Sequence, residues 1–214
     1  MGVISLHRFE TQPGRLSDHM AGTAEALGQL RGMGLQAAAL NCVAGGDVGT
    51  VTTTINHESN AAYAAAMTKV NNDEDWMSLW FRLADGGAAK PVETSIFQDV
   101  DPGFQPDPNR PMGVVTATQW RAHPGRLMDF MGNVMDSLPH IERLGGTTRV
   151  LQSLIGAHPL TVLVPVGFAD MEAYGAYSDA VATDEAFQAF WAGVMSDPTA
   201  ELIRSGLYVN ISGD

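Results

Sequence analysis

The chain has 214 residues, 45% of them hydrophobic and 17% charged, which suffices for one large domain or two small ones with packed cores. Twelve basic against twenty-four acidic residues give a net charge of −12, so nucleic acid and membranes are poor partner candidates. The single cysteine, Cys42, excludes an internal disulfide and favours a reducing, cytoplasmic location. No apolar run reaches the roughly 18 residues that a membrane span needs.

An internal repeat determines the predicted fold. The motif Pro13-Gly14-Arg15-Leu16 recurs 111 residues later as Pro124-Gly125-Arg126-Leu127. The same offset pairs Met1-Gly2-Val3 with Met112-Gly113-Val114, and no gap is needed anywhere in the alignment of the two copies. Four prolines between the copies indicate a stiff, extended linker. We therefore predict a first repeat, a proline-rich linker and a second repeat at residues 1–100, 101–111 and 112–214.

The first repeat begins with a predicted strand at Val3–Phe9, followed by the Pro-Gly turn and a helix whose apolar residues recur every three or four positions. Gly34 ends that helix in the usual C′ role. Two strands follow, Gln36–Val43 and Thr50–His57. The glycine-rich segment Ala44–Gly49 joins them, and we interpret it as a hairpin tip rather than a phosphate loop because no helix begins after it.

A helical stretch in two parts, Asn60–Val70 and Asp73–Ala84, leads to a last strand at Val92–Val100. The Asp-Glu pairs at 73–74 and 184–185 stand where helices begin, so we assign them capping roles and no catalytic role. The second repeat is predicted to contain the same strands and helices, at Val114–Trp120, from Leu127 to Gly145, and at Thr148–Ile155, Leu160–Val166, Met171–Val181, Asp184–Met195 and Leu207–Ile211.

The order β-α-β-β-α-β within each repeat is that of the ferredoxin-like fold. Its four-stranded antiparallel sheet carries helices on one side only, so the other face is left bare unless a second sheet covers it. The predicted fold class is therefore α+β, with two tandem ferredoxin-like βαββαβ repeats forming an intramolecular dimeric α+β barrel. Such an internal pseudo-dimer can pair further with a second copy.

The openings of the two repeats, LHRFETQPGRLSDHM and TQWRAHPGRLMDFM, resemble the NIPSNAP-type members of the dimeric α+β barrel superfamily. The resemblance implies a fold whose relatives include cofactor-free monooxygenases, haem-binding enzymes and many proteins of unknown activity. It also implies that a pocket opens between a sheet and its helices.

The histidines differ between the repeats, because His7 corresponds to Thr118 and His19 to Phe130. The shared fold therefore does not require a histidine at either position. His7 is predicted to lie on the strand face opposite to Arg8, where it is a candidate general base, haem ligand or lone metal ligand. The alternative is a histidine that is simply hydrogen-bonded or solvated. No spacing of His, Asp and Glu indicates a metal site, so we expect none.

The remaining candidate ligand-binding residues are basic or aromatic. Arg15 and Arg126 stand in the first turn of a helix, where free N–H groups can hold an anion, although the Pro-Gly turn alone explains the motif. Large aromatic residues in the strands and second helical stretches either line an apolar pocket or belong to the core. Together with His19 these residues form the predicted ligand-binding set: Arg15, His19, Trp80, Trp120, Arg126, Tyr174 and Trp191.

The leading functional hypothesis is that the chain binds or transforms a small apolar or aromatic molecule in a sheet–helix pocket. In the cofactor-independent, oxygenase-like version, His7 accepts a proton and Arg8 or Arg15 stabilises an oxyanion while the substrate carbanion reacts with oxygen. One alternative is a non-catalytic interaction or assembly protein with filled pockets. The other is a haem-binding protein, which the acidic surface disfavours, so no cofactor is expected. Whether the chain is an enzyme stays open on the sequence.

Overall fold

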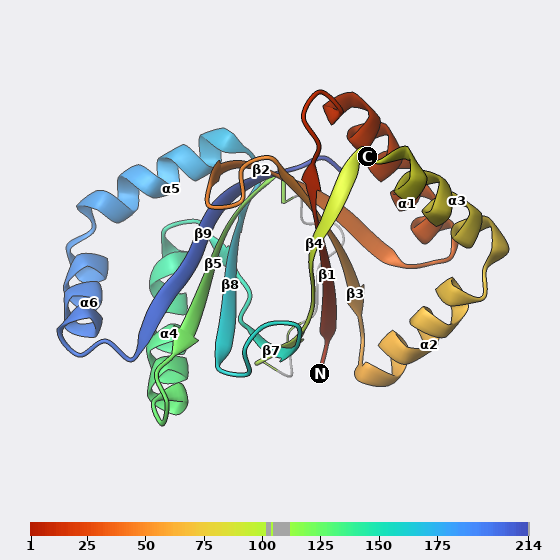
Figure 1. Ribbon diagram of the computed structural model, residues 1–214. Helices are drawn as coiled ribbons and strands as arrows, with labels where there is room; N and C mark the ends of the chain where they lie inside the picture. The colour runs from red at the N-terminus through yellow and green to blue at the C-terminus, as the bar shows by residue number, and fades with distance from the viewer. Residues whose placement is uncertain (102–103, 105–111, 214) are drawn as a thin grey trace.

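The computed structural model describes residues 1–101, 104 and 112–213. The described residues fold into two halves with the same order of strands and helices (Figure 1). The first half contains β1 (Val3–Thr11), α1 (Leu16–Gly32), β2 (Gln36–Gly45), β3 (Thr50–His57), α2 (Asn60–Asn71), α3 (Glu74–Gly86) and β4 (Ala89–Asp99). The second contains β5 (Val114–Ala122), α4 (Leu127–Arg143), β6 (Thr147–Thr148), β7 (Leu151–Ile155), β8 (Thr161–Phe168), α5 (Met171–Thr183), α6 (Glu185–Ser196) and β9 (Ala200–Asn210).

The strands form one closed antiparallel barrel. Going round the ring, the order is β5, β9, β2, β3, β1, β4, β7 and β8, and β8 pairs with β5 to close it. The short strand β6 pairs with β8 beside β7. The two halves join at β9–β2 and at β4–β7, so each edge strand of one half is paired with the other half. In Figure 1, α1–α3 cover one side of the barrel and α4–α6 the other.

Each half has its own core between its sheet and its helices. In the first half, Leu27 and Leu30 of α1 pack on Val51 and Ile55 of β3, and all four side chains are at most 3% exposed. A matching cluster of buried residues in the second half comprises Ala122, Phe130, Met131, Val134, Val150, Val162 and Val164. Because side chains alternate along a strand, the other face of every strand points into the barrel.

Several predicted details agree with the structure. The strand predicted at Thr50–His57 has those bounds, and Gly34 and Gly145 adopt φ values of +81° and +102° after α1 and α4. The carboxylates of Asp73 and Asp184 accept hydrogen bonds from backbone N–H groups at the starts of α3 and α6, as expected for caps.

Other details differ. The strand predicted at Thr148–Ile155 is interrupted, because Arg149 turns into the barrel to meet Asp99. The last strand begins at Ala200 rather than Leu207, since exposed apolar residues at its start hide the alternating pattern. The predicted linker, 101–111, lies mainly outside the described residues.

Candidate functional site

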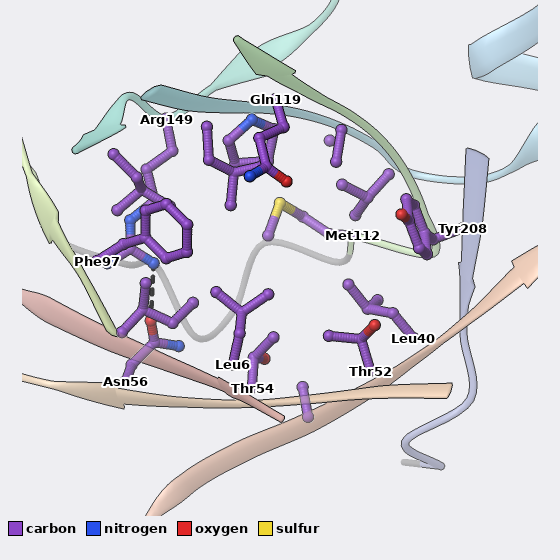
Figure 2. A pocket seen from close by; sticks show the side chains of 18 of the residues that line it. Leu6, Leu40, Thr52, Thr54, Asn56, Phe97, Met112, Gln119, Arg149 and Tyr208 are labelled. Carbon is purple, nitrogen blue, oxygen red and sulfur yellow. Dashed lines mark hydrogen bonds between the residues drawn. The ribbon is translucent and has the colours of Figure 1, made fainter. Parts of the chain in front are cut away.

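A chamber of about 300 Å³ lies inside the barrel, between the two sheets (Figure 2). Every second residue of β1 faces it, namely Ile4, Leu6 and Arg8. The residues of β5 at the same positions of the second half do so as well. Apolar side chains make up most of the wall, including Leu40, Phe97, Met112, Val115, Leu151 and Leu163.

A network of charged side chains, with Asp47 buried and the others partly buried, occupies the end of the chamber where Arg8 lies. Asp47, in the turn between β2 and β3, receives Arg8 Nη1 at 2.6 Å and Arg204 Nη1 at 3.2 Å. Glu93 of β4 is paired with the same two guanidinium groups, through Arg8 Nη2 and, at 3.1 Å, through Arg204 Nη2. Tyr208 of β9 donates its hydroxyl to Asp47 Oδ2 at 2.6 Å. Strands from both halves are therefore tied together through this network.

The network is electrically balanced, with two guanidinium groups against two carboxylates. Each oxygen of Asp47 and Glu93 accepts at least one hydrogen bond, the last of them from Ser95 Oγ at 2.7 Å. Burial, and then the hydrogen bond to Asp47, raise the pKa of Tyr208, so the phenol stays protonated. This end of the chamber consequently presents no net charge to a bound molecule.

A second ion pair lies at the opposite end. Asp99 is 1% exposed and receives Arg149 Nε at 2.6 Å and Nη2 at 2.9 Å, while Arg149 Nη1 donates to Asn56 Oδ1 at 2.7 Å. The Phe104 ring lies 4.8 Å from the guanidinium carbon. Bidentate pairing of this kind neutralises the arginine and joins β3, β4 and the β6–β7 segment.

The structure separates the two residues predicted to act together. Arg8 lines the chamber, whereas His7 points to the other face of β1, toward the helices. There its Nδ1 lies 3.4 Å from Thr94 Oγ1, and burial lowers its pKa. One bound molecule of moderate size cannot contact both side chains, because the sheet lies between them.

The predicted aromatic residues lie in the two sheet–helix layers, outside the chamber. In the first half, Phe9 lies edge-on to His19 and to Trp80, with ring centroids 6.4 and 6.2 Å apart, and His19 Nδ1 lies 2.8 Å from Thr11 Oγ1. In the second half, Trp120 and Trp191 lie 6.0 Å apart. The Tyr174 ring packs on Phe168 in the same layer.

Arg15 and Arg126 are also outside the chamber, at the starts of α1 and α4. Each donates from Nε to an aspartate three residues later, at 2.6 Å. Arg126 also pairs with Asp197 at 2.8 Å and lines a shallow pocket whose other charged groups are aspartates. Both arginines therefore already have anionic partners from the chain itself.

Three buried polar atoms of the first half have no hydrogen-bond partner among the described residues: Ser5 Oγ, Gln29 Oε1 and His57 Nε2. A fourth, Thr148 Oγ1, belongs to β6 and to the lining of the chamber. The His57 ring lies edge-on to Tyr63 at 5.2 Å. Burial lowers the pKa of His57, and nearby His7 lowers it further. The corresponding residue of the second half is Phe168, so the unpaired nitrogen belongs to one half only.

The sequence reasoning missed most of the chamber residues. Asp47 lies in the hairpin tip that the sequence predicts, but no sequence pattern indicates its burial. Glu93 and Arg204 stand 111 residues apart, so they occupy equivalent positions of the two repeats. Their opposite charges at these equivalent, inward-facing positions are the one sequence signal that indicates the ion pair.

Comparisons with known proteins show the fold. No family model matches the sequence, and no curated protein matches it significantly. A proposed monooxygenase from Fusobacterium nucleatum superposes with a TM-score of 0.68 at 11% identity, over 97% of this chain and 92% of that one. An anthrone oxidase-like protein has a TM-score of 0.62 at 15% identity, with 100% and 94% covered. A proposed chlorite dismutase has a TM-score of 0.57 at 10% identity, with 99% and 96% covered.

These similarities confirm the predicted dimeric α+β barrel of ferredoxin-like halves. At such identities they define the fold and no activity. Within the described residues, no helix is long and apolar enough to span a membrane. No group of three or more His, Cys, Asp or Glu side chains in the same part of the chain is arranged to hold a metal ion.

The charge network yields a stability prediction. Asp47→Asn leaves two partly buried guanidinium groups opposite a single carboxylate, so we expect the free energy of unfolding to fall by about 3 kcal/mol. Urea denaturation measures this change. Asp18→Asn is the matched control, since it removes one carboxylate from an exposed pair with Arg15 and is expected to change stability by less than about 0.5 kcal/mol. Equal effects of the two substitutions would contradict the assigned role of Asp47.

The buried histidines yield a pH prediction. Burial lowers the pKa values of His7, His19 and His57 below the ordinary 6.5, so the unfolded chain binds more protons than the folded one just below that pH. Stability is therefore fully present above about pH 6.5 and declines as the pH falls below it. His57→Phe, which copies Phe168, should make that decline shallower, and Phe168→His should make it steeper. Thermal unfolding from pH 7.5 to 5 tests both, and an unchanged slope in His57→Phe contradicts the assignment.

Proposed function

We propose that the protein binds a small, uncharged, largely apolar molecule inside the barrel. The observation that carries the proposal is the chamber itself, whose wall is mostly apolar and whose charged groups are paired with one another at both ends. An anion or cation would have to compete with ion pairs already formed, without regaining the hydration it loses on entry. A neutral apolar molecule pays no such penalty and gains from leaving water.

This location differs from the sheet–helix pocket that the family resemblance implies. The chamber lies on the other side of the sheets, and of the nine predicted site residues it includes Arg8 alone. The alternative of an assembly protein with filled pockets is disfavoured, because such a protein has no need of a chamber. Pairing of the chain with a second copy stays a prediction.

The finer proposal is an oxygenase-like reaction, in which a deprotonated substrate reacts directly with dioxygen. Its support is the fold shared with proteins described as monooxygenases and as anthrone oxidase-like. Within the chamber, Arg8 and Arg204 are the groups suited to stabilise a developing oxyanion, and Tyr208 lies beside them, protonated and hydrogen-bonded to Asp47. The carboxylates there are engaged by arginines, so they are poor bases.

A second candidate site lies between the sheet and the helices of the first half. There, His7 would abstract the proton from the substrate. Its support is the lowered pKa of His7, which keeps the imidazole neutral, and the unpartnered Ser5 Oγ and His57 Nε2 nearby. Arg8 cannot assist there, because it faces the chamber.

Haem binding is the least supported alternative. The described residues that line the chamber include no histidine, so an imidazole ligand would have to come from His7 or His19, in the sheet–helix layer. A Soret band on addition of haemin that is lost in His7 or His19 variants would establish it.

A pair of matched dyes tests the binding proposal. N-phenyl-1-naphthylamine is neutral, and 1-anilinonaphthalene-8-sulfonate differs from it by one sulfonate. We expect the neutral dye to bind at least about tenfold more tightly, because the sulfonate loses its hydration on entry and must compete with carboxylates already paired with the arginines. Fluorescence titration measures both affinities.

Ala117→Phe fills the chamber from β5 and should abolish binding of the neutral dye. Ala65→Phe adds the same ring on the exposed surface of α2 and is the control that should retain it. Binding that survives Ala117→Phe would place the dye elsewhere and overturn the chamber as the site.

Oxygen uptake with a panel of phenols and naphthols separates the two reaction sites. His7→Thr, which copies Thr118, should abolish turnover with little change in melting temperature if the sheet–helix site is catalytic. Ala117→Phe should abolish turnover if the chamber is. Turnover retained in His7→Thr removes His7 as the proton acceptor.

A further inference from the structure

Two strands face each other across the chamber. In the closed ring β3 and β8 are four strands apart in either direction, so they form opposite walls. The inward-facing residues of β3 correspond one by one to those of β8, at an offset of 111. Any difference between these two walls is therefore a difference at equivalent positions of the same fold.

The β3 wall is polar. Thr52, Thr54 and Asn56 line the chamber in succession, every second residue of the strand (Figure 2). Neither threonine hydroxyl has a hydrogen-bond partner among the described residues, although the two side chains are only 6% and 8% exposed. Asn56 uses its Oδ1 to accept from Arg149, which leaves its amide N–H groups for another partner.

The β8 wall is apolar. Leu163, Pro165 and Gly167 stand where β3 has Thr52, Thr54 and Asn56, and none of their side chains forms hydrogen bonds. The strands that flank β3 add apolar side chains beside its hydroxyls, namely Leu6 from β1 and Leu40 from β2 (Figure 2). On this side of the chamber the hydroxyls of β3 thus form a polar stripe between apolar side chains. Beside β8, Thr148 of β6 adds one buried hydroxyl that has no partner among the described residues.

We propose that this stripe forms hydrogen bonds with the polar edge of the bound molecule, with Thr52 and Thr54 as the specificity-determining residues. The inference rests on the proposed function, that the chamber is a binding site. The ligand class is a neutral, flat molecule with two hydrogen-bonding atoms along one edge and an apolar opposite edge. Successive inward-facing residues of a strand are about 6.6 Å apart, which sets the spacing of the two atoms.

The physical reason for selectivity is the burial of the hydroxyls. A ligand that fills the chamber removes them from solvent, so each hydroxyl must bond to the ligand or stay unpaired. A molecule with its polar atoms on opposite edges can pair with at most one of them, and it also places a polar atom against Leu163 and Pro165. Sites built to bond a polar group discriminate strongly against molecules that fail to supply it.

Two isomeric naphthalenediols test the proposal. The hydroxyls of 2,7-dihydroxynaphthalene lie on the same long edge with about the required spacing, and those of 2,6-dihydroxynaphthalene lie on opposite edges. Size, charge and the number of hydroxyls are equal. We expect the 2,7 isomer to bind about fivefold more tightly to the full chain, as measured by its own fluorescence.

The double variant Thr52→Val and Thr54→Val keeps the shape of the wall and removes the hydroxyls, so it should abolish the preference between the isomers. Thr53→Val is the matched control, because Thr53 lies between them and points to the other face of β3. Circular dichroism establishes that each variant is folded.

The outcomes are distinguishable. Equal affinity of the isomers for the wild type, or a preference that survives in the double variant, overturns the role of the stripe. Binding of N-phenyl-1-naphthylamine with binding of neither diol overturns the stripe and leaves the proposed function standing. If neither the dye nor the diols bind, the proposed function falls and the stripe with it.

Discussion

The closure of two four-stranded sheets into one ring is the constraint on which the rest of the structure depends. Closure pairs the edge strands β2 and β4 with strands of the other half, and it encloses the inner faces of both sheets. Charged groups on those faces are costly unless they are paired with one another. The network of Arg8, Asp47, Glu93 and Arg204 meets this requirement with opposite charges from both halves.

That solution is available because the two halves are one chain. In a symmetric pair of identical subunits, residues at equivalent positions near the axis meet their own copies, and Glu93 would face another glutamate. The covalent connection lets position 93 be glutamate and position 204 arginine, so that like charges are replaced by an ion pair with 3.1 Å between Arg204 Nη2 and Glu93 Oε2. The same freedom places Gln119 opposite Arg8, where it accepts from Arg204.

The fold could be predicted because its determinants are local and appear twice. The alternating pattern of Thr50–His57 predicts a strand, and the glycines after α1 and α4 predict the ends of these helices, because both depend on neighbouring residues only. The site could not be predicted in the same way. The burial of Asp47 results from its turn folding onto β9, where Gly46 N–H donates to Ser205 O, and no local pattern reports that contact. Chemical type is the signal that remains in the sequence, and it indicates histidines and aromatic residues rather than the threonines of β3.

The two halves differ most where β3 and β8 are compared. The sequence TVTTTINH of β3 has hydroxyls and an amide on its chamber face and ends in a buried histidine on its helix face. The sequence TVLVPVGF of β8 has apolar residues at the same positions, and Phe168 fills the place of His57. Unpaired polar groups in a buried strand are destabilising, and β8 shows that the equivalent positions of this fold can be occupied by apolar residues. Unpaired polar groups on both faces of β3, between the chamber and the His7 layer, make this strand the one that both proposed sites share.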